Sequence, residues 1–597
     1  MATASKKTVE IRSFMAREDN AEWVGNLWDT WNNQRAEKMA SWAETDKFIF
    51  AVDTTTTANS SLPWTHTTTL PKLTQIRDNL HANYLSSLFP NDKWLQWLAY
   101  DKNAAKAATA STIQAYMENK TREGGFRNVI SRLLYDYIDK GNAFAMPSFE
   151  ARYKDYMGEK VADFIGPVLV RISPVDIVFD PTAAAFDKTP KVVRSIKTIG
   201  ELKRLAIDNP DERFWEDVVS RRLNIRANMA NYTNTEWNKA SQYQVDGFGS
   251  LTEYYQSDYV EILEFFGDYH DAQSNTLELD RMITIVDRSI VVRDVPVPTY
   301  SGGDLIRQVG WRLRPENLWA MGPLDNLVGM QYLLDHRENM KSNALDLKVM
   351  SPLKIIGEVE EFTWGPRAEI HIDENGDVQE LAQGFNDIFA SNNEMEAIEA
   401  RMELYAGAPR EAMGVRSPGE KTAFEVQSLE NAAGRIFQEK IIQFEVFMEQ
   451  CLNDMLETSH RNMDMGDVIR VIDNDLGVQQ FLNITKEDIT ANGVLRPVGA
   501  RHFAQKAQEL QNLTGIFNSQ LGQIIAPHTS SVALTRFVED VVDLRGYEIF
   551  RPNVAVAEQQ ETQALVNQAD EDNMMESAEG MSEEELAATV SVPQNEV

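Results

Sequence analysis

The residues from Val426 to Met455 are the feature of this sequence that most restricts its fold. Apolar side chains recur there in steps of three and four, as on one face of an α-helix: Leu429, Ala433, Phe437, Ile441, Phe444, Met448, Cys451 and Met455. With its flanks, the pattern predicts a helix of about 40 residues, which at about 1.5 Å per residue is about 60 Å long. An ordinary globular domain does not need such a helix. It indicates a structural element of an assembly rather than the wall of a catalytic pocket.

The loop before this helix resembles a phosphate-binding loop but departs from it at one position. Residues 414–422 read GVRSPGEKT, one residue away from G-x-x-x-x-G-K-[ST]. Glu420 is the inserted residue, and its carboxylate would repel the anion that such a loop binds. The preceding residues 395–405 predict a helix, whereas a phosphate-binding loop follows a strand. We therefore favour a polar loop that caps the next helix through Ser417 and Thr422.

Composition restricts the class of protein. With 597 residues, of which 43% are hydrophobic, the chain can build several domains or one extended protomer and is not globally disordered. Seven of its 12 tryptophans lie in the first hundred residues, where they could anchor an interface or, more simply, fill a helical core. The single cysteine, Cys451, excludes an intrachain disulfide and a cysteine-rich zinc site. Its place on the apolar stripe predicts a buried, unreactive side chain.

The formal charge of −33, from 91 acidic and 58 basic residues, argues against a protein that wraps nucleic acid with a basic surface. An acidic wall could still let DNA pass without sticking. The N-terminus has no apolar signal core, and no run of about 18 apolar residues occurs. We therefore expect a soluble protein made in a cytoplasm, with no membrane partner.

Local patterns predict an α+β chain that is predominantly helical. Residues 16–145 have mainly helical spacing, interrupted by a Ser/Thr-rich loop at 54–69. Between 165 and 300 the pattern changes to that of a small antiparallel sheet. Its expected strands are 168–172, 176–179, 259–266, 282–287 and 289–293.

The second half follows a distinct order. A helix is predicted from Pro323 to about Met350, then a β insert with strands 368–372 and 378–381, and then a helix over 385–405. Asn375-Gly376 is a strong signal for a tight hairpin turn between those strands. After the long helix come a strand at 467–472 and helical segments to about 542. The residues after Pro552 are acidic, without Lys, Arg or aromatic residues, and predict a disordered or conditionally helical tail.

This order of helix, β insert, helix, loop and long helix resembles the stem, clip, stem, tunnel loop and wing helix of bacteriophage portal proteins. Four segments resemble portals of short-tailed phages and occur in the same order, covering most of the chain from about 60 to 450. They are 63–94 (with PKLTQIRDNLHANYLSSLFPNDKW), 172–183 (ISPVDIVFDPTA), 314–331 (RPENLWAMGPLDNLVGMQ) and 419–445 (GEKTAFEVQSLENAAGRIFQEKIIQFE).

The resemblance implies a ring, usually of twelve copies, at one vertex of an icosahedral capsid. Double-stranded DNA would enter through its channel, driven by the terminase large subunit, and leave the same way after the tail has attached. The implied partners are further copies of the chain, the terminase, the major capsid and scaffolding proteins, tail adaptor proteins, and DNA held without sequence specificity. The implied location is the virion, with assembly in the host cytoplasm, and no catalytic activity, cofactor or metal is implied.

Carried over by position, the resemblance divides the chain into eight parts. They are an N-terminal wing (1–320), a first stem helix (321–350), a clip (351–384), a second stem helix (385–407), a channel loop (408–421), a long wing helix (422–463), a C-terminal wing or crown (464–551) and an acidic tail (552–597).

Two groups of charged residues follow from this map. In the channel loop, Arg410, Arg416 and Lys421 are candidates to contact passing phosphates without reading sequence, or alternatively to pair with Glu411 and Glu420. On the second stem helix, the acidic candidates to line the channel would make its wall negative if they face the bore; otherwise they are ordinary solvated charges. These candidates are Glu394, Glu396, Glu399 and Glu403.

Other function classes fit less well. The chain has no G-x-S-x-G, H-E-x-x-H or C-x-x-C motif, so we do not expect an enzyme. A packaging ATPase is disfavoured by the interrupted phosphate loop. A head–tail adaptor should be much shorter, and a capsid subunit should contain more strand throughout.

Overall fold

The protein is a mixed helix and sheet structure of the α+β class. The computed structural model describes residues 14–50, 66–90, 94–100, 107–156, 159–208, 259–271, 276–286, 290–299, 305–349, 353–357, 376–380, 388–407, 423–463, 467–472, 479–486, 489 and 493–498. Helices make up 50% and strands 32% of the described residues. The α+β prediction is therefore confirmed, whereas the stronger expectation of a predominantly helical chain is not.

The chain divides into two compact units. One consists of Met1–Ile469 with Asn483–Ala500, and the other of Arg470–Leu482 with Arg501–Val597. The strand predicted at 467–472 is confirmed as β14 (Asp467–Ile472). Helical segments were predicted from there to about residue 542, but the described residues of that stretch include strands β15 (Gln479–Ile484) and β16 (Gly493–Pro497), so the prediction is wrong there. The remainder up to about 542 and the acidic tail after Pro552 lie outside the described residues. Apart from β14 and β15, whose residues are split between the two units, the described elements belong to the first unit.

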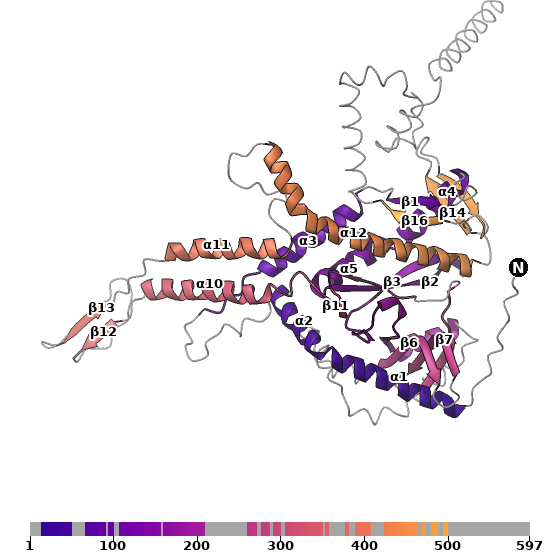
Figure 1. The fold of residues 1–597 in the computed structure, drawn as a ribbon, viewed down its shortest axis with the longest axis horizontal. Helices are drawn as coiled ribbons and strands as arrows, with labels where there is room; N and C mark the ends of the chain where they lie inside the picture. The colour runs from indigo at the N-terminus through magenta and orange to yellow at the C-terminus, as the bar shows by residue number, and fades with distance from the viewer. Residues whose placement is uncertain are drawn as a thin grey trace, which may run out of the picture. The chain divides into compact units, whose positions relative to one another are not determined.

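Helices form most of the N-terminal region and the stretch after residue 327 (Figure 1). Among the described residues they are α1 (Phe14–Gln34), α2 (Ala36–Ile49), α3 (Lys72–Leu88), α4 (Ala107–Glu123), α5 (Phe126–Asp139), α6 (Ile199–Asp208), α10 (Val328–Val349), α11 (Ile388–Tyr405) and α12 (Ala423–Asn462), with a 3-10 turn at Phe186–Lys188. The N-terminal helices follow the prediction, except that strand β1 (Leu95–Ala99) lies between α3 and α4.

The largest described sheet is antiparallel and has five strands, in the order β4-β5-β6-β7-β8. The strands are β4 (Ile177–Phe179), β5 (Lys191–Thr198), β6 (Tyr259–Asp271), β7 (Thr276–Val286) and β8 (Ile290–Pro296). The strands predicted at 176–179, 259–266, 282–287 and 289–293 are confirmed. Strand β5, which pairs β4 with β6, was not predicted.

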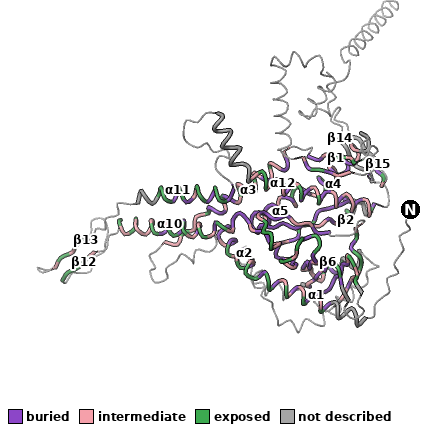
Figure 2. The backbone as a smooth tube through the Cα atoms, viewed as in Figure 1, coloured by how far each residue is buried: buried purple, intermediate pink, exposed green. Residues whose placement is uncertain are grey.

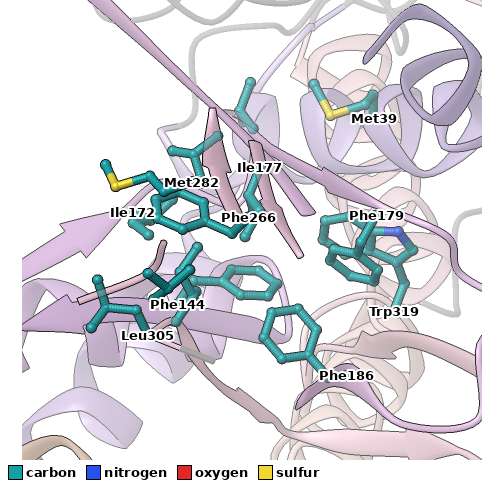
Figure 3. Close-up of a cluster of buried hydrophobic side chains, with 14 of the residues drawn as sticks. Met39, Phe144, Ile172, Ile177, Phe179, Phe186, Phe266, Met282, Leu305 and Trp319 are labelled. Carbon is teal, nitrogen blue, oxygen red and sulfur yellow. The ribbon is translucent and has the colours of Figure 1, made fainter. Parts of the chain in front are cut away.

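The two faces of this sheet bury different sets of side chains because successive residues of a strand point to opposite faces. Phe265 of β6 faces the cluster that α1 contributes to through Trp28. Its neighbour Phe266 belongs to the opposite cluster, together with Phe179 and Trp319 (Figure 3). In that cluster Trp42 and Trp319 lie 5.5 Å apart edge to face. These buried tryptophans belong to the core, which confirms the simpler interpretation of the tryptophan-rich N-terminal region for Trp28 and Trp42.

A second sheet contains a long hairpin that the sequence did not reveal. Strands β2 (Asn142–Tyr156) and β3 (Glu159–Ile172) pair antiparallel, and β9 (Arg307–Gly310) adds to the free edge of β2. Only residues 168–172 of this hairpin were predicted as a strand. Helices α5 and α12 both pack against β2 and β3. The described two-stranded sheets are β1 with β16 (Gly493–Pro497), β10 (Arg312–Arg314) with β11 (Asn317–Met321), β12 (Leu353–Ile356) with β13 (Asp377–Glu380), and β14 (Asp467–Ile472) with β15 (Gln479–Ile484).

The long helix predicted from the apolar stripe is α12, with 40 residues. From Ile441 onward the stripe residues are buried, as predicted, and the Phe444 ring meets Tyr137 of α5 edge to face at 5.3 Å. Arg307 of β9 makes a bidentate ion pair with Asp454, at 2.7 and 3.0 Å. Cys451 is fully buried, and burial raises the pKa of its thiol well above the ordinary value, so it acts as a small apolar residue.

Candidate functional site

The acidic residues predicted from the sequence lie on α11, which pairs with α10. The basic candidates Arg410, Arg416 and Lys421 lie outside the described residues, as does the whole segment 408–422. We therefore define the arm as α10, β12, β13 and α11, and treat it as the candidate functional site.

The arm is a helical hairpin with a small strand pair at its tip. Helices α10 and α11 lie side by side and antiparallel, and β12 and β13 pair between their outer ends (Figure 1). The predicted β insert between two helices is thus present. Its strand β13 pairs with β12, about 20 residues earlier in the chain, and the predicted strand 368–372 and Asn375 lie outside the described residues.

Residues 66–70 bind along one face of α10 through a series of hydrogen bonds that we call the polar ladder. Every second backbone N–H of this segment donates to a side chain of α10, and two side-chain amides of α10 donate back to backbone carbonyls. The bonds are His66 N to Asn343 Oδ1 (2.7 Å), Thr68 N to Asn339 Oδ1 (2.7 Å), Leu70 N to Asp335 Oδ1 (2.9 Å), Asn339 Nδ2 to Thr68 O (3.0 Å) and Gln331 Nε2 to Leu70 O (2.7 Å).

The ladder works because two repeats have nearly the same length. Two residues of extended chain advance about 6.6 Å, and four residues of α-helix advance about 6.0 Å. Side chains at every fourth helical position therefore meet every second backbone group of the segment, much as a neighbouring strand would. The signal in the sequence is the four-residue spacing of Gln331, Asp335, Asn339 and Asn343. Our sequence reasoning placed 54–69 in a loop and missed it.

A buried ion pair joins the inner end of α11 to α3. Lys72, the first residue of α3, is only 5% exposed, and its Nζ lies 2.7 Å from Glu403 Oε1 and 3.1 Å from Glu399 Oε2. Glu403 is itself 4% exposed. Because its carboxylate is buried against Lys72, Glu403 does not present charge to solvent in this protomer, and we revise its interpretation as a channel-lining acid.

The outer glutamates of α11 have a different environment. Glu394 and Glu396 are exposed, and Glu394 accepts a hydrogen bond of 3.3 Å from Arg337 of α10. Exposed ion pairs of this kind contribute about 0–1 kcal/mol. Glu394 and Glu396 are therefore the predicted acidic residues whose charge is most accessible on the arm, with Glu399 half-buried between them and Glu403.

Asp335 is the most unusual titratable group of the arm. It is fully buried, and its Oδ1 accepts hydrogen bonds from Leu70 N and from Gln331 Nε2 at 2.8 Å. Among the described residues its Oδ2 has no hydrogen-bond partner. Burial, only partly offset by these two hydrogen bonds, raises the pKa of Asp335 to about 6.

Apolar side chains are unusually exposed along the arm. Leu333 and Met340 lie seven residues apart, which places them on one face of α10, roughly opposite Asp335. Figure 2 shows mostly exposed and half-buried residues along both helices. The exposed large apolar residues of the arm are Leu333, Met340, Leu345, Val349, Ile355, Ile356, Leu404 and Tyr405. A concentration of this kind is typical of a surface that contacts another protein.

Comparison with known proteins provides no family for this chain. The sequence matches no protein-family model, and no curated protein is significantly similar to it. Within the described ranges, no helix combines the length and the apolar character needed to cross a membrane.

Proposed function

We propose that this chain is the protomer of a portal-type ring, through which double-stranded DNA enters and leaves a phage capsid. The observation that carries the proposal is the order of elements in one continuous stretch: α10, the β12–β13 pair, α11 and the 40-residue α12. This order resembles the stem, clip, stem and long wing helix of portal proteins. In this proposal α10 and α11 are the stem, and residues 408–421 are the channel loop.

The exposed apolar residues of the arm support assembly with other copies. In a closed ring each subunit meets its neighbour through two complementary surfaces. Leu333 and Met340 would be buried there, on the face of α10 that the polar ladder leaves open. Val349, which is 78% exposed at the outer end of α10, would gain the most burial. We expect twelve copies in the ring.

The charge distribution supports a channel that DNA passes without sticking. A wall that carries Glu394 and Glu396 would repel phosphates, and the net charge of −33 is consistent with such a wall. Arg410, Arg416 and Lys421 of the channel loop would then be the groups that touch the DNA backbone, without sequence specificity. No catalytic group, cofactor or metal is part of this proposal.

The remaining partners follow from the same arrangement. The terminase large subunit and then the tail adaptor would dock at the clip end, near β12 and β13, and the scaffolding and major capsid proteins would contact the wing. The protein would be located at the portal vertex of the virion, after assembly in the host cytoplasm.

Electron microscopy of the purified full-length protein, with its mass in solution, tests the proposal. We expect rings with a central hole, about twelvefold symmetry and a mass of about 810 kDa, twelve times the 67.7 kDa of the chain. Closed shells would instead favour a capsid subunit. A species that remains monomeric even with scaffolding protein, and joins only preformed rings, would favour an adaptor.

A matched pair of variants tests the role of the arm. Replacing Leu333 and Met340 together by Ser should abolish rings and leave a folded monomer. Leu279→Ser is the control, because Leu279 is 62% exposed on β7, outside the arm. Rings that survive the arm variant would contradict the proposed subunit contact.

A further inference from the structure

A charged cavity lies between α2, α3, α5 and β3, and we call it the arginine pocket. Its volume is 380 Å³, within the range of about 300–1,000 Å³ that small-molecule sites have. Four basic residues line it, namely Arg77, Arg132, Lys140 and Arg171, together with three acidic residues, Asp46, Asp136 and Asp139. These residues come from four elements, and none belongs to the arm.

Three of the four cations are held in place by carboxylates. Arg77 donates to both oxygens of Asp139, at 2.7 and 2.8 Å, and Arg171 makes a bidentate pair with Asp136. Lys140 pairs with Asp46. A bidentate pair uses two of the five N–H donors of a guanidinium. Each of the two paired arginines therefore keeps donors for a further oxyanion, at a fixed position.

Aromatic rings add to this rigidity. The guanidinium carbon of Arg77 lies 4.1 Å from the centroid of the Tyr135 ring and 5.6 Å from that of Phe50. The Tyr135 ring in turn stacks on His81, with a centroid distance of 3.9 Å and an interplanar angle of 4°. A cation held in this way loses little conformational entropy when a ligand binds.

Arg132 is the cation that the pocket does not neutralise. It is exposed, and no ion pair of its side chain occurs within the described ranges. With all groups ionised, the four cations and three carboxylates that line the pocket leave one positive charge. The exposed Asp78, outside the lining, lies 3.7 Å from Arg77 Nη1. The positive excess therefore belongs to the lining residues alone, on a chain whose net charge is −33. At physiological salt the distant negative charges are largely screened beyond about 8 Å.

We infer that the arginine pocket binds a phosphate group. Several guanidinium groups with unused, fixed N–H donors can bind the several oxygens of one phosphate, whereas a carboxylate offers only two oxygens. Arginine is preferred wherever phosphate is recognised in this way. A phosphate would also be an anionic partner for Arg132, which has no ion pair within the described ranges. The group could belong to a free phosphate or mononucleotide, or to the backbone of a nucleic acid. This inference does not depend on the proposed portal function.

Binding of two probes to the full-length protein tests the inference. Inorganic phosphate and a short single-stranded oligonucleotide are titrated separately against the wild type and against Arg132→Gln. We expect Arg132→Gln to weaken binding of at least one probe by tenfold or more. Its unfolding temperature without phosphate should stay that of the wild type, since Arg132 is exposed.

Arg127→Gln is the matched control, because Arg127 is also exposed on α5 but does not line the pocket. Arg132-dependent binding of inorganic phosphate identifies a small-molecule site, and such binding of the oligonucleotide alone identifies a backbone phosphate site. Both outcomes support the inference. Equal losses in the two variants, or no binding of either probe to the wild type, would overturn it.

Discussion

Replacing Lys72 by Met should loosen the inner end of the arm, because it removes the cation from a buried carboxylate. Glu403 would keep its buried position without the ammonium group that lies 2.7 Å from it. Breaking a buried ion pair from one side costs about 3–5 kcal/mol. The second partner, Glu399, is 32% exposed at its side chain, and its contact contributes about 0–1 kcal/mol. Since Glu399, beside Glu403, is partly exposed and water can approach the site from there, we take about 3 kcal/mol, the lower end of the range, as the expected loss.

A chain of two compact units need not unfold in a single step, so a global unfolding curve would not isolate the arm. Hydrogen exchange measures the loss of stability at the individual amides where it occurs. A local loss of about 3 kcal/mol corresponds to about 100-fold faster exchange through local opening. We expect this change in the amides of α11 near Glu399 and Glu403 and at the start of α3. The amides of β6 and β7, in the five-stranded sheet, provide an internal control and should exchange as in the wild type.

A double variant separates the ion pair from simple loss of packing. Replacing a buried pair by apolar side chains of similar volume is often neutral or stabilising. Lys72→Met combined with Glu403→Leu should therefore recover most of the protection that Lys72→Met loses. If Lys72→Met alone leaves α11 unchanged, or if the double variant is no better than the single one, the ion pair does not hold the arm.

Three further predictions address other parts of the molecule. The raised pKa of Asp335, about 6 against an ordinary 3.8, means that the folded arm binds more protons than the unfolded chain between these values. The free energy of unfolding of the arm should therefore fall by on the order of 2 kcal/mol as pH rises from 4 to 6. Limited proteolysis within α10 should become faster over this pH range. Asp335→Asn should remove this pH dependence. Gly141→Ala should lower the unfolding temperature sharply, because Gly141 has φ +72° and a Cβ there would lie 2.3 Å from Gly322 N. Gly125→Ala should lower the free energy of unfolding by only about 1 kcal/mol, because Gly125 has a similar φ of +70° but open space around it. Equal effects of the two substitutions would contradict the steric argument. Deleting residues 408–420 should leave rings intact in micrographs and impair DNA packaging, and loss of rings would contradict the channel-loop assignment.

Helices and strands whose apolar residues repeat with a regular local spacing were predicted correctly from the sequence. The stripe from Val426 to Met455 predicted α12 because a helix that buries one face repeats its apolar residues every three or four positions. The β-branched runs at 259–266 and 282–287 predicted β6 and β7 for a similar reason. Strand β2, in contrast, reads NAFAMPSFEARYKDY and shows little alternation. Its strand conformation depends on pairing with β3 and β9, and β9 is more than 150 residues away.

Only the tertiary structure decided what the charged residues of the candidate sites do. Glu394 and Glu403 lie on one helix in similar sequence surroundings, yet one is exposed and the other is buried against Lys72, 331 positions earlier in the chain. The polar ladder joins segments separated by more than 260 positions, and the arginine pocket combines four elements. The periodicity of a helix or strand is a local property, and so the sequence by itself determined where these elements form. Ion pairs, hydrogen bonds and cavities depend on how distant elements pack. A local pattern such as the four-residue spacing of polar residues on α10 can mark a face that forms hydrogen bonds, but it does not identify the distant segment that packs there.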